Sequence, residues 1–224
     1  MTTDRAYAPT ARTVPTRYRE RARYDQASVH AILDESLSCH VGFTGADGPV
    51  VLPTIHARLD ETLYLHGSTG SHPMIAAASA PGGLPICVTV TLVDGLVLAR
   101  SWMHHSLEFR SVVAFGNARL VTDADEKRRA LAAVVDHVAS GRSADSRPPN
   151  ARELAATAVL ALDLAEVSAK VRTGGPLDDE EDLALPHWAG ILPLTPQAGT
   201  PIPADDLDPA TPLPDYLTDY RRGR

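Results

Sequence analysis

Short runs of alternating apolar and polar residues fill the middle of the chain, and this pattern predicts β-strands. The runs cover residues 39–43, 50–55, 63–66, 86–93, 96–99, 109–121 and 159–167. Ala46-Asp47-Gly48 and Asp94-Gly95 are typical of tight turns between paired strands. Pro53 cannot donate a backbone hydrogen bond, so its run is expected at a sheet edge or a bulge, and Gly116 is expected to mark a bulge. The pattern predicts six or seven antiparallel strands.

Apolar residues at helical spacing interrupt these runs in four places. Asp25 is a typical N-cap for a helix over 25–37, and Ser71 for a short helix that ends before Pro81. Asp123 begins an amphipathic helix that ends at Gly141, and Asn150 begins a shorter one. Strands and helices together predict a mainly β protein with inserted helices, in the form of a small antiparallel barrel.

The two ends of the chain differ from the middle in composition. Residues 1–24 contain six arginines and few apolar residues, so they are expected to form an Arg-rich N-terminal arm outside the core. Residues 25–175 are expected to form one domain, in keeping with a length of 224 residues. Residues 176–224 contain nine of the 18 prolines and begin with an acidic run. This Pro-rich tail is expected to form neither a helix nor a central strand, and to pack on the barrel or on a partner subunit.

Composition excludes several classes of partner. The formal charge of -7 disfavours binding to the phosphate backbone of nucleic acids. The two cysteines are far apart in the chain, which argues against a disulfide framework and a thiolate zinc site and suits a reducing compartment. No apolar run reaches the roughly 20 residues of a membrane span. The N-terminus also lacks the apolar segment of a secretory signal. We expect a cytoplasmic protein that binds neither nucleic acid nor membrane.

The densest group of small and polar residues lies where a predicted strand leads into a predicted helix. Its sequence is His66-Gly67-Ser68-Thr69-Gly70-Ser71-His72. Small residues allow close backbone approach, and a helix N-terminus offers free N–H groups to an anion, so the segment suits a phosphate. The same residues also suit an ordinary connection between a strand and a helix, because no P-loop or dinucleotide pattern is present. Both interpretations stay open at this point.

Two smaller clusters could also carry chemistry. His104-His105 could ligate zinc or haem iron, but adjacent residues on a strand point to opposite faces, so no metal site is predicted. Lys170 and Arg172 follow the last predicted strand and could contact an anion or a flavin. Cations in a loop are more often simply solvated.

Three segments, in order along the chain, resemble the FMN-binding split-barrel proteins. They are PVVLPTIHARLDETLYLHGSTGS, CVTVTLVDGLVLARSWMHHSLEFRSVVAFGNARLV and SAKVRTGGP with the later WAGILPL. Among these proteins the chain looks like the nitroimidazole-resistance branch of the pyridoxamine 5'-phosphate oxidase superfamily, over about residues 20–195. The resemblance implies a homodimer of split β-barrels with FMN in a groove between the subunits.

The resemblance also implies roles for individual residues. The cofactor-binding residues that it implies are Pro53, Thr54, His66, Gly67, Ser68, Ser71, His72, Ser111 and Lys170. Among them, His66 matches a histidine beside the flavin and is expected to act as a catalytic donor or proton relay. The oxidases have Arg or Lys at phosphate-binding positions where this chain has Val51, His72 and Pro73. The negative charge of FMN is therefore expected to be met by His72, Arg110, Lys170, Arg172 or the arm.

These features together predict an FMN-dependent oxidoreductase that acts on a small organic substrate such as a nitro compound or a quinone. Oxidation of vitamin B6 is not expected, because the chain ends in PDYLTDYRRGR and lacks the Arg-Leu-x-Pro ending of the oxidases. One alternative is a flavin or haem carrier of the same fold without turnover. A structural dimer without a cofactor is a further alternative.

Overall fold

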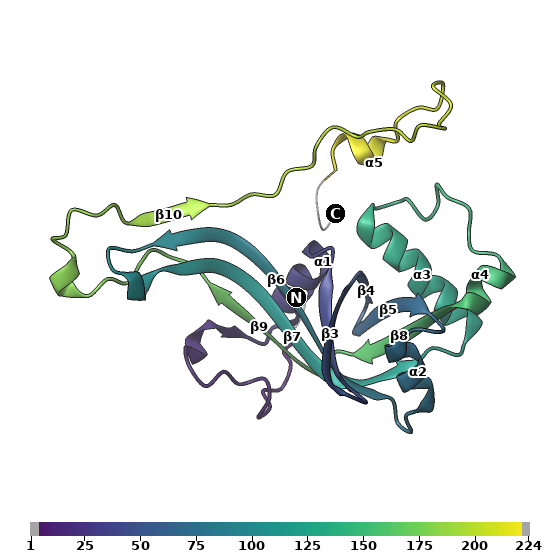
Figure 1. Ribbon diagram of the computed structural model, residues 1–224, viewed down its shortest axis with the longest axis horizontal. Coiled ribbons are helices and arrows are strands. Elements are labelled where there is room, and N and C mark those ends of the chain that lie inside the picture. The colour runs from purple at the N-terminus through teal and green to yellow at the C-terminus, as the bar shows by residue number, and fades with distance from the viewer. Residues whose placement is uncertain (1–4, 221–224) are drawn as a thin grey trace.

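Within residues 5–220, ten antiparallel strands form one branched sheet (Figure 1). The computed structural model describes residues 5–220, so four residues of the predicted arm and four of the predicted tail lie outside the described range. The strands are β1 (Ala22–Arg23), β2 (Cys39–Gly45), β3 (Gly48–Thr54), β4 (His56–Leu59), β5 (Thr62–Ser68), β6 (Leu84–Leu98), β7 (Ser106–Leu120), β8 (Thr157–Asp163), β9 (Glu166–Arg172) and β10 (Gly190–Pro193). The helices are α1 (Gln26–Glu35), α2 (His72–Ser79), α3 (Ala124–Val138), α4 (Ala151–Ala156) and α5 (Asp215–Thr218), with 3-10 turns η1 (Arg19–Arg21), η2 (Trp102–His104) and η3 (Glu180–Asp182).

The main path through the sheet has the order β3-β2-β6-β7-β8-β5-β4, and this confirms the mainly β, antiparallel prediction. β3 lies at one end of this path, so Pro53 lies on an edge strand as expected. Asp25, Asp123 and Asn150 each accept a hydrogen bond from a backbone N–H of the first helical turn, which confirms three of the predicted helix starts.

The sheet divides at β7. The first half of β7 pairs with β9, whereas Arg119 and Leu120 pair with β8. Gly116 lies between these two pairings, and a Cβ there would be 2.7 Å from the Leu162 side chain. The pairing of β7 with β6 continues through Gly116 without a shift. The bulge predicted at Gly116 is therefore wrong, and the glycine instead allows β8 to cross close to β7.

β6 is one strand of 15 residues, although two strands joined at Asp94-Gly95 were predicted. The register between β6 and β7 shifts between Val93 and Gly95. The Asp94-Gly95 pair therefore forms a bulge, and the chain reverses only after Leu98. Arg110 on β7 donates to both carboxylate oxygens of Asp94, at 2.9 and 2.7 Å, which holds this residue in the bulge.

Three other expectations differ from the structure. Residues 159–167, predicted as one strand, belong to the two strands β8 and β9, because the chain turns after Asp163 and Leu164 N donates to Glu61 O. β4 was not predicted, because its four residues are too few to give a clear alternation. The tail does contain a short helix, α5, and a strand, β10, which pairs with the last residues of β6, from Gly95 to Leu98.

The two faces of the β6–β7–β9 region differ in character. Val90, Val112 and Ala169 point into the main core and are almost fully buried. Their neighbours alternate with them and point to the opposite side. We call this side the outer face; it includes Thr89, Thr91, Ser111, Val113, Ser168 and Lys170, which are partly or fully exposed.

The N-terminal arm, here residues 5–24, docks on the barrel. Tyr7 belongs to the main core cluster and is 8% exposed, so the expectation that the arm contributes nothing to the core is wrong at this residue. The Tyr7 hydroxyl donates to Glu61 at 2.7 Å and lies 3.0 Å from His30 Nε2. Arg12 bonds to Glu166, and Ala22 pairs with Lys170 along the edge of β9. The arm therefore extends the sheet beside β9.

The far ends of β6 and β7 project from the barrel, and β10 lies along β6 there (Figure 1). From β10 the Pro-rich tail runs back across the molecule to α5. Near α5, Tyr216 donates to Asp145 at 2.6 Å and Tyr220 donates to the carbonyl of Val138 at 2.8 Å. These contacts attach the end of the tail to the region of α3.

Candidate functional site

An apolar pocket of about 400 Å³ lies between the β2–β3 pair, β5 and the beginning of α2. It is lined by Val41, Phe43, Val50, Leu52, Pro53, Thr54, Leu65, His66, Gly67, Ser71, His72, Pro73, Met74 and Leu160. No Lys, Arg, Asp or Glu is among these lining residues. The pocket has the volume and the mostly apolar lining of a small-molecule site, with two imidazoles as its main polar groups.

The pocket brings together six of the residues that the sequence predicted. They are Pro53, Thr54, His66, Gly67, Ser71 and His72. Ser68 is exposed and does not line the pocket; its carbonyl accepts a hydrogen bond from the Ser71 hydroxyl at 2.9 Å. Phe43 and Met74 also line the pocket and were not predicted from the sequence. Met74 could have been predicted, because it lies three residues after Ser71 and therefore on the same face of the helix.

His66 is the polar group best placed to act in the pocket. It lies on β5, opposite Val159 of β8. Its Nδ1 is buried and has no hydrogen-bond partner. Burial also lowers the pKa of His66 below the ordinary value for histidine, so the ring is neutral near pH 7. A neutral imidazole with a free nitrogen can ligate a metal centre or form a hydrogen bond with a polar atom of a ligand.

The turn before α2 offers few donors to a phosphate. The N–H of Ser71 donates to Ser68 O, and that of Met74 donates to Ser71 O. Pro73 has no N–H. The hydroxyl of Ser71 also points back to Ser68 O, so Ser71 occupies the N-cap position without capping the helix. This geometry favours the ordinary strand-to-helix connection over the phosphate cradle.

Gly67 keeps the wall of the pocket closely packed. A Cβ at this position would lie 3.1 Å from Met74 Cε and 3.4 Å from Ser71 Oγ. Met74 itself is buried. A larger side chain at Gly67 would therefore push Met74 away from its place and change the shape of the pocket.

Ser111 and Lys170 lie on the outer face and not in the pocket. They are directly opposite each other on β7 and β9, and Thr91 of β6 is opposite Ser111. Within residues 5–220, the amine of Lys170 forms no hydrogen bond and no ion pair. These three residues give the outer face a row of two hydroxyls and one available cation, which is the donor set that an anionic group requires.

Arg110 and Arg172 are occupied by partners within the chain. Arg110 forms ion pairs with Asp94 and Glu35, and these hydrogen bonds, first that with Asp94, hold its pKa above the ordinary value. Arg172 is buried and donates to the carbonyls of Gly174 and Gly175. Both guanidinium groups therefore stabilise the fold, and neither is free to bind a cofactor as predicted.

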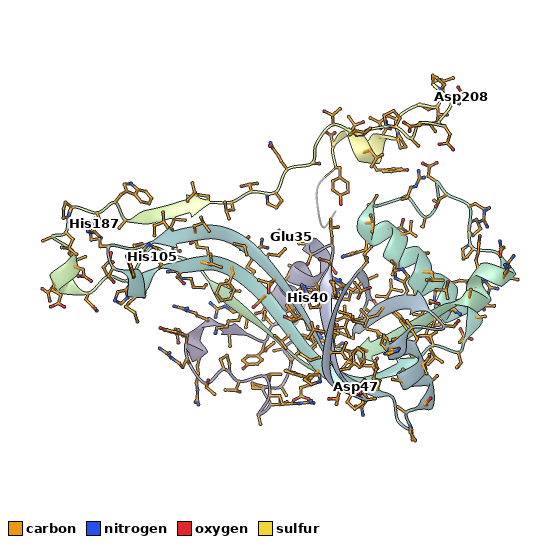
Figure 2. All side chains as sticks on the ribbon, viewed as in Figure 1. Glu35, His40, Asp47, His105, His187 and Asp208 are labelled. Carbon is orange, nitrogen blue, oxygen red and sulfur yellow. The ribbon has the colours of Figure 1, made fainter. Side chains whose placement is uncertain are left out.

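His105 lies at the projecting end of the β6–β7 hairpin (Figure 2). Neither His104 nor His105 lines the pocket. His104 is the last residue of η2 and His105 follows it. The expectation that the two side chains point to opposite faces of a strand therefore does not apply. His104 Nε2 lies 3.2 Å from Asp179, and His105 Nδ1 lies 2.9 Å from Ser101 O. Over residues 5–220, no group of three or more His, Cys, Asp or Glu residues is arranged to hold a metal ion. No helix in this part of the chain is long and apolar enough to cross a membrane.

The branched antiparallel sheet with a pocket beside β5 defines a split-barrel protein. Residues 25–171 match the family profile described as pyridoxamine 5'-phosphate oxidase, and the chain belongs to this family. This match confirms the resemblance seen in the sequence. A comparison with curated proteins gives no match.

Solved structures agree with this family over most of the chain. The flavocytochrome Anf3 from Azotobacter vinelandii is 42% identical, with a TM-score of 0.88, and the match covers 96% of this chain and 99% of that one. The FAD and haem binding protein from Mycobacterium smegmatis is 36% identical, with a TM-score of 0.83, over 90% of this chain and 98% of that one. A candidate 5-nitroimidazole antibiotic resistance protein from Bacteroides thetaiotaomicron is 22% identical, with a TM-score of 0.56, over 67% and 86% of the two chains, and supports the fold alone.

Proposed function

We propose that this protein binds a flavin on its outer face and haem in its apolar pocket. The observation that carries the proposal is the chemical difference between the two sites. The pocket is apolar, uncharged and contains the unpartnered Nδ1 of His66, whereas the outer face holds hydroxyls and the available amine of Lys170. Two relatives that are 42% and 36% identical to this chain are described as a flavocytochrome and as an FAD and haem binding protein.

The pocket residues fit haem better than they fit the phosphate of a flavin. Histidine and methionine are common axial ligands of haem iron, and His66, His72 and Met74 all line the pocket. A phosphate would need cations or free N–H groups, and the turn at Ser71 has few free N–H groups. We therefore assign His66 or His72 to the iron, and Phe43 and Leu65 to the macrocycle. Their apolar side chains would also exclude water from the iron.

The outer face fits a flavin. Lys170 would neutralise negative charge on its phosphate groups, and Ser111 and Thr91 would donate hydrogen bonds to it. We propose FAD over the FMN that the resemblance implies, because the relative from Mycobacterium smegmatis is described as binding FAD. We also propose that the flavin lies between two copies of the chain, as the resemblance implies for this family.

Bound flavin and haem would together supply oxidoreductase chemistry, because a flavin exchanges electron pairs with a donor and single electrons with an iron centre. The chain's own residues bind and orient these groups. The role expected for His66 changes accordingly: like His72, it is proposed as a ligand of the iron and not as a donor of a proton to the substrate. Reduction of a nitro compound or a quinone, expected from the resemblance, remains the proposed use of the electrons.

Cofactor content of purified variants tests this assignment. We expect His66→Ala or His72→Ala to remove or shift the Soret band obtained on haem titration, and to leave the amount of extracted flavin unchanged. Lys170→Gln is expected to lower flavin content at least about threefold and to leave the haem spectrum unchanged. His105→Ala, which alters an imidazole outside the pocket, is the control. Mass analysis of the extracted flavin distinguishes FAD from FMN.

Two results would contradict the proposal. Loss of flavin from Ser71→Ala/His72→Ala, with normal flavin content in Lys170→Gln, would place the flavin in the pocket. Failure of the wild-type protein to take up any flavin would overturn the function as a whole, while the fold would stand.

A further inference from the structure

The projecting end of the β6–β7 hairpin exposes an unusual amount of apolar surface. We call residues 99–105 and 176–188 the tip. Arg100 joins its two segments, because its backbone N–H and its guanidinium each donate to Asp178 at 2.8 Å. Trp102 is 94% exposed, Met103 87% and Trp188 67%. Apolar side chains gathered on one exposed surface mark an interaction site.

The tip is also strongly acidic. Asp179, Glu180, Glu181 and Asp182 follow one another around η3. The only ion pair of these four within residues 5–220 joins Asp179 to His104. The tip thus combines two exposed tryptophans with uncompensated negative charge. Its partner should therefore offer cations and surfaces on which aromatic rings can stack.

The N-terminal arm has the complementary character. Between residues 17 and 23, the arm has one acidic residue, Glu20, and four arginines, Arg17, Arg19, Arg21 and Arg23. The ring of Tyr18 is 47% exposed, and the guanidinium of Arg21 stacks on it at 4.0 Å. Within the described chain, no hydrogen bond or ion pair joins the arm to the tip. Each of these two surfaces faces solvent in a single copy.

We propose that the tip of one copy docks on the arm of a second copy of this chain. The two surfaces have opposite charge, and one chain carries both. A two-fold dimer therefore pairs them reciprocally, tip with arm and arm with tip. Arginine stacks well on tryptophan, so Trp102 and Trp188 gain a partner along with the carboxylates.

This docking also completes the flavin site, and in that respect it rests on the proposed function. β1 of the arm pairs directly with β9, where Ala22 is opposite Lys170. A tip bound to the arm therefore lies at the edge of the outer face, beside the row of Lys170 and Ser111. The partner's tip would cover that edge and restrict access of water to the flavin.

Charge exchange between two variants tests the contact. The tip variant carries Glu180→Arg and Glu181→Arg, and the arm variant carries Arg17→Glu and Arg19→Glu. We expect each variant alone to self-associate at least roughly 100-fold more weakly than the wild type in sedimentation velocity, because like charges then face each other. An equimolar mixture of the two variants should associate again. In a mixed dimer the reversed tip of one variant meets the reversed arm of the other, and the two unreversed surfaces meet each other, so opposite charges face each other at both contacts.

The mixture identifies the occupant as a second copy. A contact within one chain could not be restored by mixing, and a contact with another basic protein would leave self-association unchanged in both variants. Either result would overturn the proposal. Arg128→Glu/Arg152→Glu on α3 and α4 changes the net charge by the same amount as the arm variant and should not weaken association.

Tryptophan fluorescence gives a second readout, because Trp102 and Trp188 are the two tryptophans of the chain and both belong to the tip. On dilution of the dimer, we expect the emission to move to longer wavelength as these rings become exposed. A dimer whose tryptophans emit like exposed ones would overturn the proposal. Flavin extracted from the same samples distinguishes the docking from the proposed function. Association through the tip without bound flavin contradicts the proposed function alone. Bound flavin, with association that the charge reversals leave unaltered, contradicts the docking alone.

Discussion

The imidazole of His56 is fully buried. Its Nε2 donates to the carbonyl of Leu33 at 2.9 Å, which leaves Nδ1 with a lone pair and no partner. The ring of His137 lies 4.8 Å away, centroid to centroid. Burial first, and His137 second, lower the pKa of His56 to about 4, although Asp34 acts in the opposite direction. The folded protein therefore requires His56 to be neutral.

This requirement predicts a loss of stability in acid. In the unfolded chain the pKa of histidine is about 6.5, so between pH 6.5 and pH 4 the unfolded state binds a proton that the folded state does not. The free energy of unfolding should fall as the pH is lowered through this window, by about 3 kcal/mol in total. Urea unfolding at several pH values measures the slope. His56→Gln, which keeps an N–H for Leu33 O, should flatten the slope, and parallel curves for the two proteins would contradict the explanation.

Gly116 has a packing role that can be measured directly. A methyl group there would lie 2.7 Å from the side chain of Leu162, which is 1% exposed. We expect Gly116→Ala to lower the free energy of unfolding by about 1–3 kcal/mol, as overpacking of a core does. Gly175→Ala is the matched control, because nothing lies within 4 Å of its Cβ position. Equal stability of the two variants would exclude the close crossing of β7 and β8.

At the scale of helices and strands, Arg110 joins three secondary-structure elements. Its guanidinium on β7 bonds Asp94 in the bulge of β6 and Glu35 at the end of α1. We expect Arg110→Gln to lower the free energy of unfolding by about 1 kcal/mol, since the two carboxylates then face each other without a cation. Flavin content per folded chain should not change. If the variant had normal stability but lost its flavin, Arg110 would have to be a cofactor-binding residue.

The sequence predicted those elements whose signal is local. Three helix starts could be predicted from their N-cap residues, Asp25, Asp123 and Asn150, because the capping hydrogen bond is made within four residues. Asp94-Gly95 misled the prediction, because the same dipeptide suits a hairpin turn and a bulge. The choice between them depends on Arg110, which lies 16 residues further along the chain.

The candidate site was also predictable only in part, because some of its residues are placed by contacts between segments that are far apart in the sequence. The segment from His66 to His72 is continuous in the sequence, and the structure does place most of it in one pocket. Whether Lys170 joins that pocket depends on which face of β9 it occupies. That face is set by the pairing of β9 with β7. The sequence pattern had predicted one strand over residues 159–167, where the structure has parts of β8 and β9.

At the scale of the whole molecule, one sheet separates two environments. The apolar pocket opens among β2, β3, β5 and α2, and the row with Lys170 lies on the outer face of β6, β7 and β9. Residues that the resemblance assigned to one cofactor therefore lie in two places. This separation would allow a single small chain to hold the two different groups proposed for it.

β10 has a consequence for the behaviour of the chain in solution. β2 pairs with only four residues of β6, up to Thr89, whereas β10 covers the stretch from Gly95 to Leu98. A chain that ended at residue 175, the boundary predicted for the barrel, would leave that stretch of backbone N–H and C=O groups open to strands of other molecules. We expect this truncated chain to form β-rich aggregates that bind thioflavin T, and a chain that ends at residue 195 to remain free of them. Aggregation of both chains alike would assign the effect to the rest of the tail. On this prediction the Pro-rich tail protects the chain from aggregation, because β10 covers the edge of β6 and Pro193 has no N–H to donate to a further strand.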